Sequence, residues 1–88
     1  MHFREIECSE AVAEKIQSKH GVEPSEVEEV LADDPQARRA GRELYSVSGR
    51  TDSGRYLVIL LHDLGDGVGR LVTAREMDAS ERRAHRKR

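Results

Sequence analysis

The chain has few of the aromatic residues that build a large core. Its 88 residues include one phenylalanine, two tyrosines and no tryptophan. A domain of this size buries roughly 60–65% of the surface that its unfolded chain exposes, so the core must come from Val, Leu, Ile and Ala. The sequence therefore predicts one domain over residues 1–88, with a core thin enough for a partner to add to its stability.

Cysteine and long apolar segments are also scarce. Cys8 is the only cysteine, so no internal disulfide can form, which fits a reducing cytoplasm. The longest apolar run, residues 56–61, is far shorter than the roughly 20 residues of a membrane-spanning helix. The first ten residues lack the apolar segment of a signal peptide. We expect a cytoplasmic protein that does not bind membranes.

The four histidines are scattered, and none stands at a zinc-site spacing from Cys8. The sequence accordingly predicts no metal and no cofactor. The segment GDGVG, residues 65–69, resembles a phosphate-binding loop, but it precedes an expected strand instead of a helix N-terminus. These glycines therefore predict a hairpin turn.

Charge is divided unevenly along the chain. Residues 1–34 carry ten acidic and three basic residues, a balance of −7, whereas residues 35–88 carry seven acidic and twelve basic residues, a balance of +5. Such a division predicts two surfaces of opposite charge, one of them suited to an anionic partner. Solvated faces of separate helices and strands explain the same numbers equally well.

Hydrophobic periodicity predicts three helices and a small sheet. Ser9 and Asp78 are suited to N-cap helices, Glu81 completes a capping box with Asp78, and Gly21 is suited to end the first helix. We expect strands at 3–8, 36–40, 43–50, 55–62 and 70–75, and helices at 10–19, at 24–31 and after residue 78. The fold class is α+β: a small antiparallel sheet with two N-terminal helices and one C-terminal helix, one sheet face being partly open. The run RYLVILLH, residues 55–62, is expected at the centre of the sheet.

Arginines stand at the ends of the expected strands. Arg50 ends one strand, Arg55 begins the next, and Arg70 and Arg75 bracket a third. Alternation along a strand places Leu71, Thr73 and Arg75 on one side of the sheet. Clustered guanidinium groups bind phosphate oxygens in pairs, which favours a nucleic-acid surface. Ordinary pairing with Asp52, Asp63 or Glu76 is the alternative that spacing leaves open.

Several segments together resemble one family. The segment LVTAREMDASERR, residues 71–83, is similar to the last strand and helix of BrnT toxins, and KHGVEPSEVEEVL, residues 19–31, is similar to their helix turn and second helix. The step from Gly54 to Arg55 before an apolar strand also corresponds. The resemblance spans about residues 10–84. His85 stands where the last helix of that family usually carries a tyrosine.

The resemblance implies a RelE-like fold and a metal-independent endoribonuclease. Such an enzyme is the toxin of a bacterial type II toxin–antitoxin system that cleaves RNA to block translation. The implied partners are RNA and a DNA-binding antitoxin of the ribbon-helix-helix, BrnA-like kind. Two other functions stay open: a non-catalytic BrnT-like module that binds RNA or protein, and a structural subunit that forms a homodimer through its open sheet face.

Metal-independent cleavage requires fixed cations at the phosphate and groups that transfer protons. Arg75, at the position matched to the family, and Arg55 are the first candidates for the charge; His62 and Glu76 are the candidates for proton transfer. Each also has a structural interpretation, Glu76 as an ion-pair partner and His62 as a histidine at a strand end. The residues expected to bind RNA are Arg50, Arg70, Lys19, His20, Arg82 and Arg83.

Overall fold

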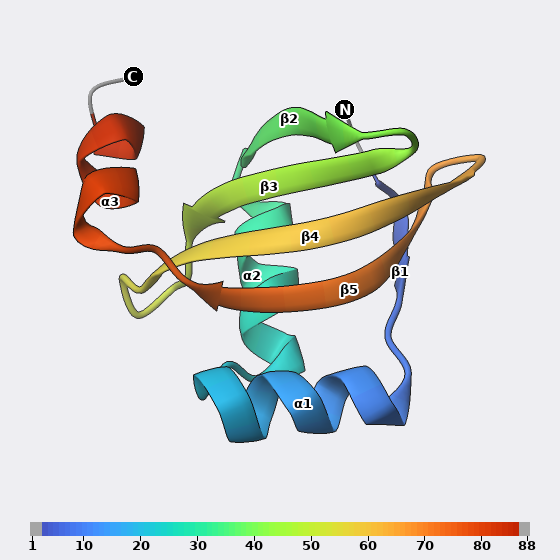
Figure 1. The fold of residues 1–88 in the computed structure, drawn as a ribbon, viewed down its shortest axis with the longest axis horizontal. Helices are drawn as coiled ribbons and strands as arrows, with labels where there is room; N and C mark the ends of the chain where they lie inside the picture. The colour runs from blue at the N-terminus through green and yellow to red at the C-terminus, as the bar shows by residue number, and fades with distance from the viewer. Residues whose placement is uncertain (1–2, 87–88) are drawn as a thin grey trace.

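The computed structural model describes residues 3–86, which form one sheet and three helices (Figure 1). Lys87 and Arg88, at the basic end of the chain, lie outside the described residues. In chain order the elements are β1 (Glu5–Glu7), α1 (Glu10–His20), α2 (Pro24–Ala32), β2 (Gln36–Gly41), β3 (Leu44–Arg50), β4 (Tyr56–Gly65), β5 (Val68–Glu76) and α3 (Ala79–Arg86). The α+β prediction is confirmed, and each expected helix and strand forms within a few residues of its predicted bounds.

The five strands lie in the order β1-β5-β4-β3-β2, so the apolar strand β4 is central, as predicted. Neighbours from β2 to β5 are antiparallel, but β1 pairs with β5 in parallel. The expectation of a wholly antiparallel sheet is therefore wrong for β1. Two helices separate β1 from the rest of the sheet, so no hairpin fixes its direction.

The core lies between the sheet and the helices α1 and α2. Ile16 of α1 and Val27 and Val30 of α2 are buried against alternate residues of the strands. The sheet residues of this cluster are Val47, Leu57, Ile59, Leu61, Leu71 and Ala74. Along β4 the buried residues alternate with half-buried ones, so one face of the central strand is covered and the other is partly open.

The helix ends follow the local signals in the sequence. The Ser9 side chain accepts a hydrogen bond from the Val12 N–H at 3.1 Å, and Gly21 ends α1 with a left-handed φ of 62°. At the start of α3, the Asp78 and Glu81 carboxylates each accept a hydrogen bond from the other's N–H, at 2.8 and 2.9 Å. This reciprocal pair is the predicted capping box, and it fixes where α3 leaves β5.

A bulge in β5 changes which of its residues share a face. Leu60 pairs with Thr73 and Leu61 pairs with Leu71, so Val72 is an extra residue in β5. Leu71 is consequently buried in the core, while Thr73 lies on the opposite side. The prediction that Leu71 shares a side with Thr73 and Arg75 is wrong, because simple alternation does not cross a bulge. The Lys15 ammonium of α1 donates to the Val72 carbonyl at 2.9 Å and satisfies the bulged backbone.

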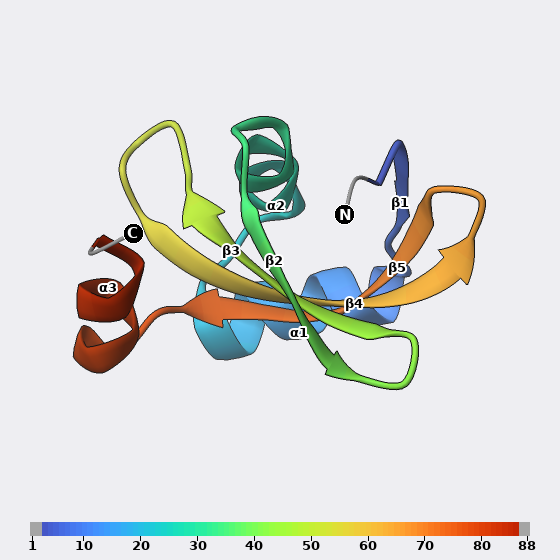
Figure 2. The ribbon, with the colours of Figure 1, turned by 90° about the horizontal axis from the view of Figure 1, so that it is seen from above.

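The helix α3 stands at the end of the sheet where β5 finishes, away from α1 and α2 (Figures 1 and 2). None of its residues is buried. Through residues 3–86, the three helices are too short and too polar for any of them to cross a bilayer.

Candidate nucleic-acid interface

The face of the sheet opposite α1 and α2 is polar and basic. Residues paired across neighbouring strands point to the same side, and the pairings align Gln36, Ser48, Val58 and Arg75 in one row across β2, β3, β4 and β5. The next row holds Arg38, Ser46, Leu60 and Thr73. Hydroxyl, amide and guanidinium groups therefore lie side by side over the half-buried side chains of β4.

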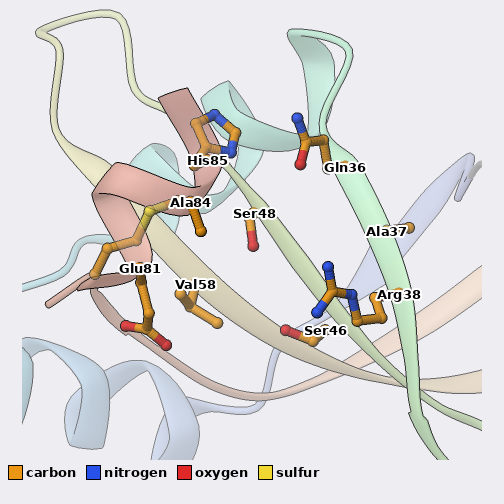
Figure 3. A pocket seen from close by; sticks show the side chains of 10 residues that line it. Gln36, Ala37, Arg38, Ser46, Ser48, Val58, Glu81, Ala84 and His85 are labelled. Atoms are coloured by element: carbon orange, nitrogen blue, oxygen red, sulfur yellow. The ribbon is translucent and has the colours of Figure 1, made fainter. Parts of the chain in front are cut away.

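A groove of about 180 Å³ runs between this face and α3 (Figure 3). In Figure 3, Gln36 and His85 face one another across the groove, with Ser48 between them, and Arg38 lies near Ser46. The residues that line it are Gln36, Ala37, Arg38, Ser46, Ser48, Val58, Met77, Glu81, Ala84 and His85. The groove thus joins the edge strand β2 to the last helix, segments far apart in the sequence.

Arg75 contacts two residues that line the groove: it pairs across strands with Val58, and its guanidinium binds Glu81 of α3. Its Nη1 donates to Glu81 Oε1 at 2.7 Å and its Nη2 donates to Oε2 at 2.8 Å. The Arg75 hydrogen bonds lower the pKa of the Glu81 carboxyl to about 2, with help from the Asp78 N–H. The same pair raises the pKa of Arg75, against the effect of burial. A phosphate that binds Arg75 must compete with this carboxylate.

Beside the groove, the Tyr56 ring contacts both Arg50 and His85. The Arg50 guanidinium lies 5.3 Å from the centre of the Tyr56 ring, and the His85 ring meets the same tyrosine edge-on with 5.7 Å between centres. His85 Nδ1 is shielded from solvent and has no hydrogen-bond partner among residues 3–86. The Tyr56 ring therefore holds both a guanidinium that has no hydrogen-bond partner among residues 3–86 and an imidazole whose Nδ1 is unpaired but shielded.

Arg55 is placed on the other side of the molecule, where it joins three elements. Its Nη1 donates to Glu26 of α2 at 2.8 Å and to the Gly21 carbonyl after α1 at 3.0 Å, and its Nη2 donates to Glu76 of β5 at 2.6 Å. The expectation that Arg55 converges with Arg50 and Arg75 on the open face is wrong. Arg55 precedes β4 and turns towards the helices, where two carboxylates hold it.

The pKa values of Arg55 and Glu26 reflect the same contacts. The hydrogen bond to Glu76 outweighs burial and raises the pKa of Arg55. Burial acts to raise the pKa of Glu26, but the Glu23 N–H and Arg55 together lower it. The structural interpretation of Glu76, as an ion-pair partner of an arginine, is confirmed by these contacts, whereas its role in proton transfer stays a prediction.

His62 and Arg70 lie on the open face but at its far end. They pair directly with one another across β4 and β5, four residues along β4 from Val58, which is roughly 13 Å. His62 Nε2 is 3.8 Å from a Glu43 carboxylate oxygen, and Arg70 is 3.5 Å from Glu7. The structure therefore does not bring His62 together with Arg75.

The other residues predicted to bind RNA are divided between two surfaces. Lys19 and His20 are exposed at the end of α1, on the helix side of the sheet. Arg82 and Arg83 are exposed on α3, between Glu81 and Ala84, which line the groove. Only the α3 pair is close enough to add positive charge to the open face.

Sequence reasoning missed Gln36, Arg38, Ser46 and Ser48 as site residues. A signal was present, because each pair is spaced two apart on an expected strand and so shares one face. Nothing in the sequence indicated that β2 and α3 close around the same groove. Within residues 3–86, no cluster of three or more histidine, cysteine or carboxylate side chains is arranged to hold a metal ion.

No protein-family model and no curated protein sequence matches the chain. Its structure is similar to the crystal structure of BrnT, a ribonuclease toxin of Brucella abortus, with a TM-score of 0.71. The likeness covers 84% of this chain and 96% of that one, at 13% sequence identity. The chain therefore has the fold of a BrnT toxin, as the resemblance in its sequence predicted, and identity this low establishes the fold alone.

Proposed function

We propose that the chain is a metal-independent endoribonuclease toxin of a type II toxin–antitoxin system. The observation that supports this most is the groove on the open face of a BrnT-like fold, which Arg38 and His85 line. Arg50, stacked on Tyr56, and Arg75, paired across strands with Val58, lie on the same face. Because this face is basic and the helix layer is acidic, a polyanion is attracted to the groove side.

In the proposed reaction, the 2′-hydroxyl of the RNA attacks the adjacent phosphate. The O2′–P bond forms and the P–O5′ bond breaks, which leaves a 2′,3′-cyclic phosphate and a 5′-hydroxyl end. Arg75, released from Glu81, and Arg50 bind the phosphate oxygens, where charge grows in the transition state. The imidazole of His85, which lines the groove, accepts the 2′-hydroxyl proton, and water protonates the leaving oxygen.

An antitoxin is the proposed protein partner. A cytoplasmic toxin must be held inactive, and an acidic segment of an antitoxin would neutralise the same basic face that RNA requires. We propose that a ribbon-helix-helix antitoxin covers the groove and α3. Binding of the antitoxin and binding of RNA would then be mutually exclusive.

Expression in bacteria from a tightly repressed promoter tests the toxin function. Growth arrest that Arg75→Ala and His85→Ala both relieve is expected, with about 10²–10³-fold slower cleavage of RNA by purified Arg75→Ala. Arg39→Ala is the matched control, because Arg39 lies on the opposite side of β2, over Tyr45. Normal growth with intact, soluble wild-type protein at high level contradicts the proposal.

One observation favours the second candidate, a non-catalytic RNA-binding module. The arginine matched to the family, Arg75, is neutralised by Glu81 through two short hydrogen bonds. If purified protein binds RNA with a strong salt dependence but leaves it uncut, the binding module is the better description.

A further inference from the structure

We infer that the groove between β2, β3 and α3 binds one unstacked purine base of the RNA. This inference rests on the proposed function for its RNA substrate and adds the base that the site selects. It derives from the polar groups that line the groove, their direction and the size of the space.

The groove is large enough for a base and is walled on both sides. Its volume of about 180 Å³ exceeds the roughly 150 Å³ of an engineered protein cavity that binds benzene. Val58 and Ser48 form the floor, and the His85 ring stands on the α3 side. Proteins that read RNA sequence commonly hold a splayed base against such a ring, with polar groups at its edge.

The edge of the groove carries the two residue types that pair with purines. Gln36 and Arg38 are two residues apart on β2 and both line the groove. A glutamine amide can pair with N6 and N7 of adenine, and an arginine can pair with O6 and N7 of guanine, each through two hydrogen bonds. Pyrimidines lack N7, so neither pairing is available to them.

The groups in the groove are free to bind. Among the hydrogen bonds within residues 3–86, none involves the side chains of Gln36, Ser46 or Ser48, which line the groove. A site whose polar groups lack internal partners discriminates strongly, because the wrong base leaves them without hydrogen bonds. Arg50 and Arg75, at the α3 end of the face, are then placed to hold the phosphates next to the selected base.

The experiment uses four nine-residue oligonucleotides, each with four uridines on either side of one central A, G, C or U. Deoxyribose at the central residue and its two neighbours removes the 2′-hydroxyls that would react near the base. Fluorescence anisotropy of labelled oligonucleotides measures the dissociation constant for each. The wild-type chain is expected to bind the A and G oligonucleotides about tenfold more tightly than the C and U ones.

Substitutions separate base selection from electrostatic attraction. Gln36→Leu is expected to abolish the preference for A, and Arg38→Gln the preference for G. Arg39→Gln is the control, since it removes the same charge from the adjacent residue on the other side of β2 and should weaken all four oligonucleotides equally. Circular dichroism melting confirms that the variants are folded.

The outcomes distinguish this inference from the proposed nuclease. If the wild-type chain binds all four oligonucleotides equally, or if Gln36→Leu loses the same affinity for each of them, the inference of a purine-binding groove is overturned. The proposed nuclease activity is unaffected by either result. A purine preference in a chain that never cuts RNA supports the groove and contradicts the nuclease. Absence of any RNA binding overturns both.

Discussion

Arg75 of β5 and Glu81 of α3 are joined by two parallel hydrogen bonds of 2.7 and 2.8 Å. Since no residue of α3 is buried, this pair and the contact of His85 with Tyr56 are principal attachments of the helix to the sheet. One ion pair therefore both positions α3 and neutralises the arginine best placed for phosphate.

Removal of the Glu81 charge should strengthen RNA binding. Glu81→Gln keeps an oxygen for the Asp78 N–H but frees the Arg75 guanidinium. We expect roughly five- to tenfold tighter RNA binding at low salt and a larger dependence of affinity on salt, by about one phosphate contact. Glu14→Gln, an equal charge change on exposed α1, is the control. Unchanged affinity and salt slope in Glu81→Gln would show that phosphate does not reach Arg75.

The same pair should make stability depend on acid pH. The folded chain lowers the pKa of Glu81 to about 2, below its ordinary value near 4.5, so the pair stabilises the fold above pH 4.5 and its contribution is lost as pH falls towards 2. Because Arg75 and Glu81 are partly exposed, we expect up to about 1 kcal/mol. Urea unfolding of wild type and Glu81→Gln should differ at pH 6 and converge near pH 2. A constant difference across that range argues against the ion pair.

Arg55 should be essential to the fold. Its guanidinium joins the end of α1, the start of α2 and the end of β5, with only 28% of the side chain exposed. Arg55→Ala leaves Glu26 partly buried without its partner, and we expect a loss of about 2–3 kcal/mol in the free energy of unfolding.

Arg55→Lys tests whether stability requires the planar guanidinium group, because a lysine ammonium cannot bind both carboxylates at once. We expect it to recover less than half of the lost stability. Arg50→Ala is the comparison, since loss of an exposed stack on Tyr56 should cost only about 0.5–1 kcal/mol. Equal stability of the two alanine variants would contradict the structural role of Arg55.

Gly49 should tolerate no side chain. A Cβ at this position would lie 2.9 Å from Val30 Cγ1, where β3 passes under α2. We expect Gly49→Ala to destabilise the chain by about 1–3 kcal/mol through overpacking. Gly41→Ala, whose Cβ would meet nothing nearer than 3.6 Å, is the matched control. Thermal melts of the two variants give the comparison, and similar midpoints would contradict the close approach.

Local signals in the sequence were enough to locate most of the elements. The caps at Ser9, Gly21 and Asp78 depend on hydrogen bonds within a few residues, so sequence alone predicts where helices begin and end. The apolar run of β4 predicted the centre of the sheet, because only a strand with neighbours on both sides buries so many large side chains.

The site could be predicted only in part. Arg50 and Arg75 were identified from strand ends, and both do lie on the open face. The bulge at Val72 and the turn of Arg55 towards the helices could not be predicted, since each depends on partners in other elements: Leu60 and Leu61 of β4 for the bulge, and Glu76 of β5 for Arg55.

The sequence by itself determined the order of helices and strands, the composition of the core and the division of charge, because these follow from local propensity and periodicity. The tertiary structure alone decided which charges meet. It paired Arg75 with Glu81 and brought Gln36 opposite His85, since those distances depend on how β2 and α3 pack at the end of one sheet.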